Sequence, residues 1–103
     1  MTGLVTPLGG SNRPGVGAAK ARLRALGVDP YAWSNGPGDR YGAHEHAFTK
    51  LLICAEGSIT FLLGEDGEPV ELAAGEGFEL PGGTRHAAVV GSRRLHGLEG
   101  HRP

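Results

Sequence analysis

The sequence predicts one small all-β domain, a barrel or sandwich of short strands, with a short helix near its N-terminus. Its 103 residues include nineteen glycines and seven prolines, which are too many for a helical bundle. The glycines follow no fixed period, so collagen-like and low-complexity sequence are excluded. Short apolar runs separated by turn residues at intervals of about eight to twelve residues are typical of sandwiches and barrels.

Two parts are expected along the chain. Residues 1–14, which are rich in Gly, Pro, Ser and Asn, are predicted to form a flexible arm. Residues 15–103 are predicted to form a single domain, with a helix over 15–27 and a barrel over 28–100. Because open sheet edges need cover, the arm is a candidate for that role.

The helix is predicted from apolar residues that recur at steps of three and four: Val16, Ala19, Leu23 and Leu26. Pro14 suits a helix start, and Gly27 suits a C-terminal stop. We expect this apolar stripe to pack on the outside of the barrel, with the basic residues between its members facing solvent.

Beyond the helix, the apolar residues fall in short runs between turns. The segment Gly64-Glu65-Asp66-Gly67 is the strongest hairpin signal among these turns. Strands are therefore predicted over residues 31–34, 46–55, 58–63, 69–73, 78–80, 84–90 and 94–98.

Charge and composition exclude several kinds of partner. Ten basic and eleven acidic residues give a net charge of −1, so we expect no nucleic acid and no membrane among the partners.

Cys54, the only cysteine, lies in an apolar run, which favours a buried thiol over a reactive one. No charged N-terminal region leads into a long apolar stretch, and no run approaches the roughly 20 apolar residues of a membrane span. We therefore expect a soluble, cytoplasmic protein.

Three histidines carry the candidate chemistry. His44 and His46 are two residues apart, and residues at even spacing on a strand face the same side, so both imidazoles are expected to point one way. The same parity puts Phe48, Lys50, Leu52 and Cys54 on that side. His86 begins another strand in which its parity partners, Ala88 and Val90, are apolar, which fits an inward face. Three imidazoles would leave open positions on a metal ion, as catalytic sites require. Taken alone, however, a His-x-His pair on a strand is more often a surface or structural feature.

The glycines around these histidines strengthen the metal-site interpretation. Gly38, His44, His46, Lys50 and Gly57 follow the pattern G-x5-H-x-H-x3-K-x6-G. A second pattern, G-x5-P-x-G-x2-H, is made by Gly75, Pro81, Gly83 and His86. In order and spacing the two patterns resemble the two motifs of the cupin superfamily, and they lie within residues 38–90, about half of the chain.

The resemblance implies a cupin jelly roll, a double-stranded β-helix barrel, in which His44, His46 and His86 hold one divalent transition metal: iron, manganese, nickel or zinc. Cupins include dioxygenases, isomerases and decarboxylases that act on small molecules. The first hypothesis is therefore a metal-dependent dioxygenase or isomerase whose small-molecule ligand is anionic. Because small cupins commonly dimerise, a homodimer is also expected.

Two positions depart from the cupin motifs. Lys50 stands where the first motif usually has a glutamate that is the fourth metal ligand, and Val90 stands where the second usually ends in asparagine. The loss of the asparagine is expected to cost little chemistry. An ammonium a few ångströms from a divalent ion, by contrast, would repel it by several kcal/mol, as an order of magnitude, even at an effective dielectric constant near 20.

Several explanations of Lys50 remain open. In the first, the Lys50 amine is neutral; in the second, it pairs with a carboxylate such as Glu79 or Glu99; in the third, its charge binds an anionic substrate. Alternatively, the metal has been lost and Lys50 only reaches toward the barrel mouth. The second hypothesis is accordingly a non-catalytic cupin that binds a small molecule or a metal through a degenerate site.

Four other residues are weaker candidates. His96 is expected to be exposed, with a ligand role only if it faces inward, and His101 is expected to lie in a frayed tail. Glu45 is expected to face away from the histidines, as a surface residue or a partner of the ligands. Arg40 shares the parity of His44 and could meet an anion at the rim, although an arginine in a turn is usually solvated.

Overall fold

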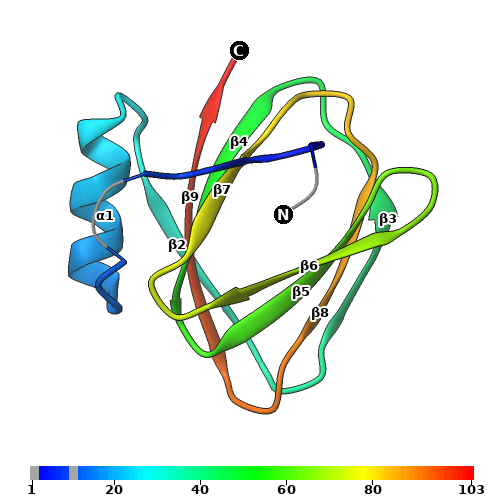
Figure 1. The fold of residues 1–103 in the computed structure, drawn as a ribbon. Coiled ribbons are helices and arrows are strands. Elements are labelled where there is room, and N and C mark those ends of the chain that lie inside the picture. The colour runs from blue at the N-terminus through cyan, green and yellow to red at the C-terminus, as the bar shows by residue number, and fades with distance from the viewer. Residues whose placement is uncertain (1–2, 10–11) are drawn as a thin grey trace.

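The short apolar runs pair into two antiparallel β-sheets that face each other, with a helix on the outside (Figure 1). The structure is a computed structural model that describes residues 3–9 and 12–103. Its elements are β1 (Thr6–Pro7), α1 (Val16–Ala25), β2 (Tyr31–Asn35), β3 (Arg40–His44), β4 (Thr49–Glu56), β5 (Ser58–Leu63), β6 (Glu68–Ala73), β7 (Gly77–Leu80), β8 (His86–Val90) and β9 (Leu95–Arg102). One sheet has the strand order β1-β7-β4-β9-β2, and the other has the order β3-β8-β5-β6.

This arrangement confirms the predicted jelly roll, but the sheets do not close into a continuous barrel. Strands β2 and β3 follow each other in the chain and lie at the ends of different sheets. A tight turn joins them, in which the Gly36 amide donates a hydrogen bond of 2.8 Å to the Asp39 carboxylate. The chain therefore crosses between the sheets at this turn instead of hydrogen-bonding one edge to the other.

The space between the sheets is filled by one face of each strand. Along β4, Leu52 and Cys54 belong to this inner core, as the period-two pattern predicted. Burial raises the pKa of the Cys54 thiol to about 11, and the acidic Glu76 adds to the effect. The expected role of Cys54 as a small buried plug is therefore confirmed.

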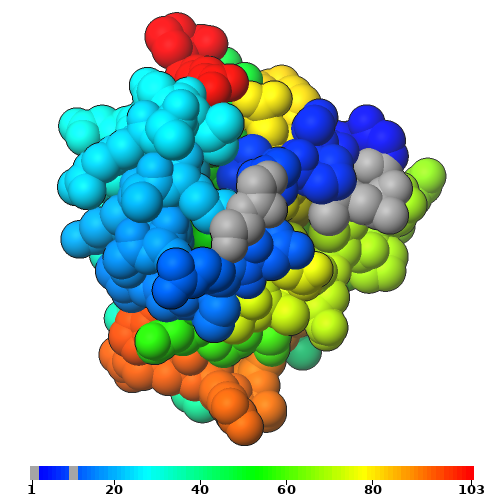
Figure 2. All heavy atoms as spheres, turned by 60° about the vertical axis from the view of Figure 1, so that its left-hand side comes forward, coloured from blue at the N-terminus to red at the C-terminus, as the bar shows by residue number. Residues whose placement is uncertain are grey.

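The opposite face of β4 packs against the helix. Ala19 and Leu23 of α1 are fully buried in a second apolar cluster with Leu51 and Ile53 of β4. Figure 2 shows the helix and the N-terminal segment covering this face of the molecule. Leu26, the fourth residue of the predicted stripe, lies just past the helix and is 38% exposed. In the described ranges, 3–9 and 12–103, no helix has the length and apolar character that crossing a bilayer requires.

The N-terminal arm is only partly as expected. Thr6 and Pro7 pair with β7, and Val5 is buried in the core between the sheets. An apolar residue at this place gains by leaving water, and the paired strand covers an otherwise open edge of the sheet. Residues 1–2 and 10–11 of the predicted arm lie outside the described residues.

Two strand predictions were wrong in their bounds. The strand predicted over 46–55 is β4, which begins only at Thr49, and residues 45–48 connect it to β3, a strand that was not predicted. Strand β9 continues to Arg102 because it stays paired with β4, where Lys50 lies opposite His101. The tail expected to fray is therefore part of the sheet, and it carries His101 to the edge of the cavity described below.

Replacement of Leu23 by alanine is predicted to destabilise the fold by about 2–5 kcal/mol, because it leaves a cavity where a fully buried side chain packed. The matched control is Leu26→Ala at the exposed end of the same helix, for which we expect less than about 1 kcal/mol. Urea denaturation measures both values. Equal losses in the two variants would show that the helix does not pack through Leu23.

Candidate metal centre

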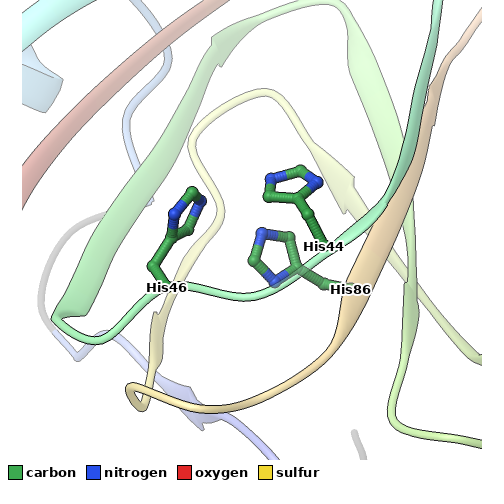
Figure 3. A group of neighbouring side chains, drawn as sticks. All are labelled: His44, His46 and His86. Atoms are coloured by element: carbon green, nitrogen blue, oxygen red, sulfur yellow. The ribbon is translucent and has the colours of Figure 1, made fainter.

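Strand pairing brings His44 and His86 together. His44 ends β3, His86 begins β8, and the two residues are direct partners in the antiparallel register. Their ring centroids are 4.3 Å apart (Figure 3). An antiparallel partner pair projects its side chains to the same face of the sheet, so both rings point between the sheets.

His46 reaches the same point from a loop. It was expected on a strand with His44, but it lies in the 45–48 connection after β3 ends. Its ring centroid is nevertheless 4.8 Å from that of His44 and 5.3 Å from that of His86. The Gly83 amide donates a hydrogen bond of 2.7 Å to the His46 carbonyl, and a side chain at Gly82 would meet the Ala47 carbonyl at 2.6 Å. The turn before β8 thus holds the His46 loop in place, which strand parity could not reveal.

Hydrogen bonds orient two of the three rings. The Nδ1 atoms of His44 and His86 lie 2.7 and 2.9 Å from the carbonyl oxygens of Gly42 and Thr84. A carbonyl only accepts, so each Nδ1 carries the proton and donates it, and each Nε2 keeps a free lone pair. This is the usual way in which proteins prepare a histidine to ligate a metal.

Two nitrogen atoms of the cluster have no partner. The Nε2 atoms of His46 and His86 are buried and make no hydrogen bond to any described residue. A buried polar atom without a partner costs about 1–3 kcal/mol, so its presence needs a reason. A metal ion shared by the rings would satisfy both lone pairs.

The spacing of the rings is compatible with one ion after a small adjustment. One nitrogen from each of the three histidines lies within 4.8 Å of the other two. Zinc–nitrogen bonds of about 2.0–2.1 Å in a tetrahedral centre would bring the nitrogens to about 3.4 Å from one another. Metal binding would therefore draw the three nitrogens closer together than they lie here.

The protonation states also favour ligation. Burial lowers the pKa of the His86 imidazole, and burial lowers that of His46, where the positive charge of Lys50 adds to the effect. Both rings therefore stay neutral at pH values where a free histidine begins to take up a proton. Neutral imidazole is the form that binds a metal ion.

Lys50 points into the space below the histidines, where Glu99 of β9 pairs with it. Lys50 Nζ lies 3.4 Å from Glu99 Oε2, and the two side chains are 14% and 8% exposed. Among the explanations left open for Lys50, pairing with a carboxylate is the one that this geometry supports. The other carboxylate considered, Glu79, is engaged by Arg102 at 2.8 Å.

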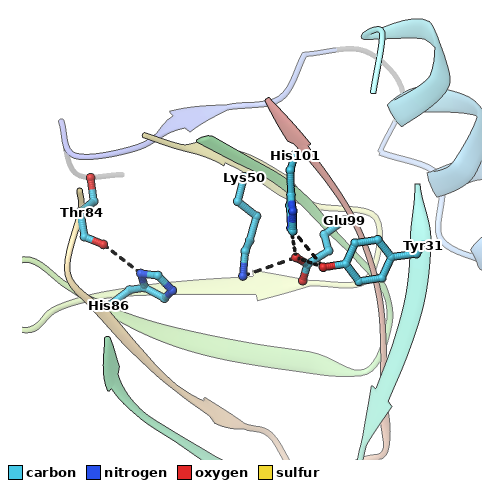
Figure 4. A network of polar contacts seen from close by, with 6 residues as sticks. All are labelled: Tyr31, Lys50, Thr84, His86, Glu99 and His101. Carbon is cyan, nitrogen blue, oxygen red and sulfur yellow. Dashed lines mark hydrogen bonds and ion pairs between the residues drawn. The ribbon is translucent and has the colours of Figure 1, made fainter. Parts of the chain in front are cut away.

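Two further groups meet Glu99 at the same oxygen (Figure 4). The Tyr31 hydroxyl donates a hydrogen bond of 2.6 Å to Glu99 Oε2, and His101 Nε2 lies 2.6 Å from that atom. Neither Tyr31 nor His101 was expected at the site. The signal that could have found His101 is the period of two that continues along β9 past Leu98, where Glu99 and His101 share one parity. Tyr31 lies opposite Glu99 in the pairing of β2 with β9, which no local pattern reports.

A cavity of about 340 Å³ opens beside the three rings. Its walls include Lys50 and Glu99 near the histidines, together with these further side chains: Tyr31, Trp33, Tyr41, Leu52, Ile59, Phe61 and Ala88. The absence of a side chain at Gly97 of β9 lets the Trp33 indole lie against that strand, because a side chain there would meet the indole at 2.5 Å. The arrangement joins a polar end, which carries the candidate ligands, to a mostly aromatic and aliphatic body.

The weaker candidates from the sequence do not line this cavity. Glu45 is exposed, as expected, and so is Arg40. His96 lies away from the three rings and faces Glu56 at 3.8 Å, with a half-exposed side chain. The structure thus brings together His44, His46 and His86 and leaves His96 outside.

Comparison with known proteins shows a shared fold. No protein-family model and no curated protein sequence matches the chain. The chain is similar in structure to the DMSP lyase DddQ from Ruegeria pomeroyi DSS-3, with a TM-score of 0.65 and 25% identity, covering 74% of this chain and 38% of that one. It is also similar to a cupin-2 domain containing protein from Shewanella frigidimarina NCIMB 400 (TM-score 0.59, 20% identity, 72% and 68% covered).

A third similar structure is the CENP-C cupin domain of Drosophila melanogaster (TM-score 0.63, 13% identity, 71% and 59% covered). This chain spans well under half the length of the DMSP lyase, and the three proteins differ in kind. The fold is therefore common to them, while the function has to be argued from the site.

The Glu99 network predicts how stability depends on pH. Burial tends to raise the pKa of Glu99, but the hydrogen bonds from Tyr31 and His101 and the charge of Lys50 outweigh it, so the pKa is lowered in the folded protein. A lowered carboxyl pKa contributes stability above the unfolded value of 4.5, and this contribution is lost as the pH falls through the folded value.

We therefore expect the free energy of unfolding of the wild type, measured with urea, to fall more steeply below pH 4.5 than that of Glu99→Gln. The control is Glu56→Gln, whose side chain is 58% exposed and which should follow the wild type. Parallel curves for wild type and Glu99→Gln would refute the electrostatic role of Glu99.

Proposed function

We propose that this chain, which belongs to the cupin superfamily by its fold, binds one divalent transition-metal ion through His44, His46 and His86 and uses it to act on a small molecule held in the adjoining cavity. The observation that carries the proposal is the pair of buried, unpartnered Nε2 atoms on His46 and His86, with His44 within reach of the same point. Three imidazoles leave coordination positions for water or a substrate, as catalytic metal sites do.

The donor set suits iron, manganese, nickel or zinc, because imidazole is a ligand that these metals share. When bound, such an ion would act as a Lewis acid or activate oxygen. The chain's own residues do the rest of the work. Carbonyl groups fix the tautomers of His44 and His86, the apolar walls exclude water, and Glu99 offsets the ammonium of Lys50 beside the ion.

The proposed substrate is small. A water molecule takes up about 30 Å³ of liquid, so a cavity of about 340 Å³ has room for about eleven non-hydrogen atoms. Anionic oxygen groups are favoured at the metal end, where the ion would leave net positive charge. Lys50 lines the cavity and remains the candidate substrate-binding residue, with Glu99 holding its charged end. The homodimer also remains part of the proposal, since β2 and β6 end their sheets with an open side.

A second candidate function is a non-catalytic binding protein. The observation that favours it is Lys50 itself, which stands at the motif position where the cupins that this chain resembles usually have a fourth, anionic ligand. The fold is also that of the CENP-C cupin domain. In this alternative the cavity holds a ligand without turnover.

Metal content tests the first step. We expect purified wild-type protein, incubated with cobalt or zinc and passed through a desalting column, to retain about one ion per chain by elemental analysis. His86→Ala should lose it, because two imidazoles bind far more weakly than three. His96→Ala, which removes a histidine outside the cluster, should retain it. Equal metal content in wild type and His86→Ala would contradict the proposed centre.

Turnover separates the enzyme from the binding protein. We expect iron-loaded protein either to consume oxygen with at least one member of a panel of small thiols, diketones and phenols, or to convert that compound to an isomer. His86→Ala should lose the activity. Oxygen electrode traces and mass spectrometry of the panel provide the measurement. Saturable binding of a panel member with neither oxygen uptake nor a changed mass or isomer would favour the alternative.

A further inference from the structure

The position of Glu99 makes it a candidate for direct ligand recognition. Glu99 is only 6% exposed, and it lines the cavity beside Lys50. Every hydrogen bond and ion pair that its side chain makes with the described residues ends on one oxygen, Oε2, which contacts Tyr31, Lys50 and His101. Figure 4 shows these contacts converging on that atom.

The second carboxylate oxygen, Oε1, is left without a partner in the described part of the chain, yet it is not sealed. The side-chain atoms that are both unpartnered and fully enclosed there are Arg22 Nε, Trp33 Nε1, His46 Nε2 and His86 Nε2. Because Glu99 Oε1 is not among them, it is not fully enclosed, and the cavity that its side chain lines is the space from which a molecule would reach it. A carboxylate oxygen has only acceptor sites, so what it requires is a hydrogen-bond donor.

The charge balance indicates the same chemistry. Lys50 already has a carboxylate partner at 3.4 Å, so its ammonium is not a free cation that an anionic ligand would seek. Glu99 is a carboxylate ion that Tyr31 and His101 also stabilise. An anionic group would be repelled at Oε1, whereas a hydroxyl or amine would form a charge-assisted hydrogen bond there.

The walls of the cavity describe the remainder of the ligand. Trp33 and Tyr41 form an edge-to-face pair with centroids 6.3 Å apart, and Phe61 and Ala88 are neighbours on adjacent strands. Aromatic walls of this kind favour flat apolar groups. Ala88 is the small residue next to His86 in the inward row of β8, which leaves space directly below the rings.

We propose that Glu99 Oε1 accepts a hydrogen bond from the ligand. The cavity therefore selects a flat, mostly apolar molecule of about eleven non-hydrogen atoms. This molecule carries an oxygen-donor group for the metal and a separate hydroxyl or amino group for Glu99. The place of the oxygen-donor group rests on the metal site proposed above. The role of Glu99 rests on its own geometry. This role makes Glu99 a residue that determines specificity. Glu99, and not Lys50, then recognises the hydroxyl or amino group of the ligand.

Isosteric probes test this proposal. Benzoate, the three hydroxybenzoates and the three methoxybenzoates differ in whether a donor is present and where it lies, with little change in size. Isothermal titration calorimetry on the zinc-loaded full chain should show at least one hydroxybenzoate binding about tenfold or more tightly than the methoxybenzoate of the same substitution pattern, as expected for a charge-assisted hydrogen bond. No such preference at any ring position would overturn the proposal.

The matched variants are Lys50→Met and Lys50→Met/Glu99→Leu. The first keeps the acceptor, and the second removes it without leaving an unpaired ammonium, a replacement that buried ion pairs often tolerate. We expect the hydroxy-over-methoxy preference, taken as a ratio of affinities within each variant, to persist in the first and to fall to about threefold or less in the second. A preference that survives in the double variant would refute the role of Glu99. Should the double variant fail to fold, Glu99→Gln replaces it. The proposal then requires the hydroxy-over-methoxy preference of Glu99→Gln to be at least about threefold weaker than that of the wild type.

Zinc stoichiometry on the same samples separates the two proposals. A wild-type chain that holds no zinc would refute the metal centre. One zinc per chain, combined with equal affinities within each hydroxy and methoxy pair, would refute the acceptor role of Glu99 alone.

Discussion

The buried ion pair between Lys50 and Glu99 sets the charge of the cavity beside the three histidines. An ammonium in a cavity of low dielectric would oppose a divalent ion nearby by several kcal/mol, as an order of magnitude. Glu99 Oε2 lies 3.4 Å from that ammonium, so the two charges offset each other and the repulsion that a metal ion would meet is smaller. Ion pairs of this kind are costly to desolvate and need further hydrogen bonds, which Tyr31 and His101 supply at 2.6 Å. The electrostatics of the cavity thus depend on β9 as much as on the strands that carry the histidines.

Backbone geometry explains how the imidazoles converge. His44 and His86 meet because β3 and β8 pair with those residues opposite each other. His46 joins them because the turn before β8 holds its loop. The Gly83 amide donates a hydrogen bond to the His46 carbonyl, and Gly82 allows the turn to approach Ala47 closely. Gly75 has a φ of +92°, and a side chain there would meet the Asn12 carbonyl at 2.0 Å, so this motif position accepts glycine only. Gly82 and Gly83 therefore position the loop of His46, whereas Gly75 fits the turn between β6 and β7 against Asn12.

Much of the fold could be predicted from the sequence, because turn residues and the period-two pattern are local signals. The helix, the inward face of β4 and the burial of Cys54 were predicted from such patterns and are confirmed. The interpretation of His44 and His46 as neighbours on one strand was wrong, since the bound between β3 and the loop depends on tertiary contacts with the turn at Gly83.

The polar half of the cavity was harder to predict from the sequence. Strand β9 was expected to end at residue 98, and its last residues are held by pairing with β4, which no local pattern reports. His101 was missed for the same reason, and Tyr31 was missed because its place opposite Glu99 comes from the pairing of β2 with β9. Glu99 was considered only as one of two partners for Lys50. The unpaired oxygen of Glu99 is a property of the assembled cavity, because it depends on which oxygen three distant residues reach. Crystals of the chain soaked in cobalt would settle whether the histidines hold a metal: anomalous diffraction should give one strong peak between His44, His46 and His86. A map with no peak there at saturating cobalt would contradict the metal centre.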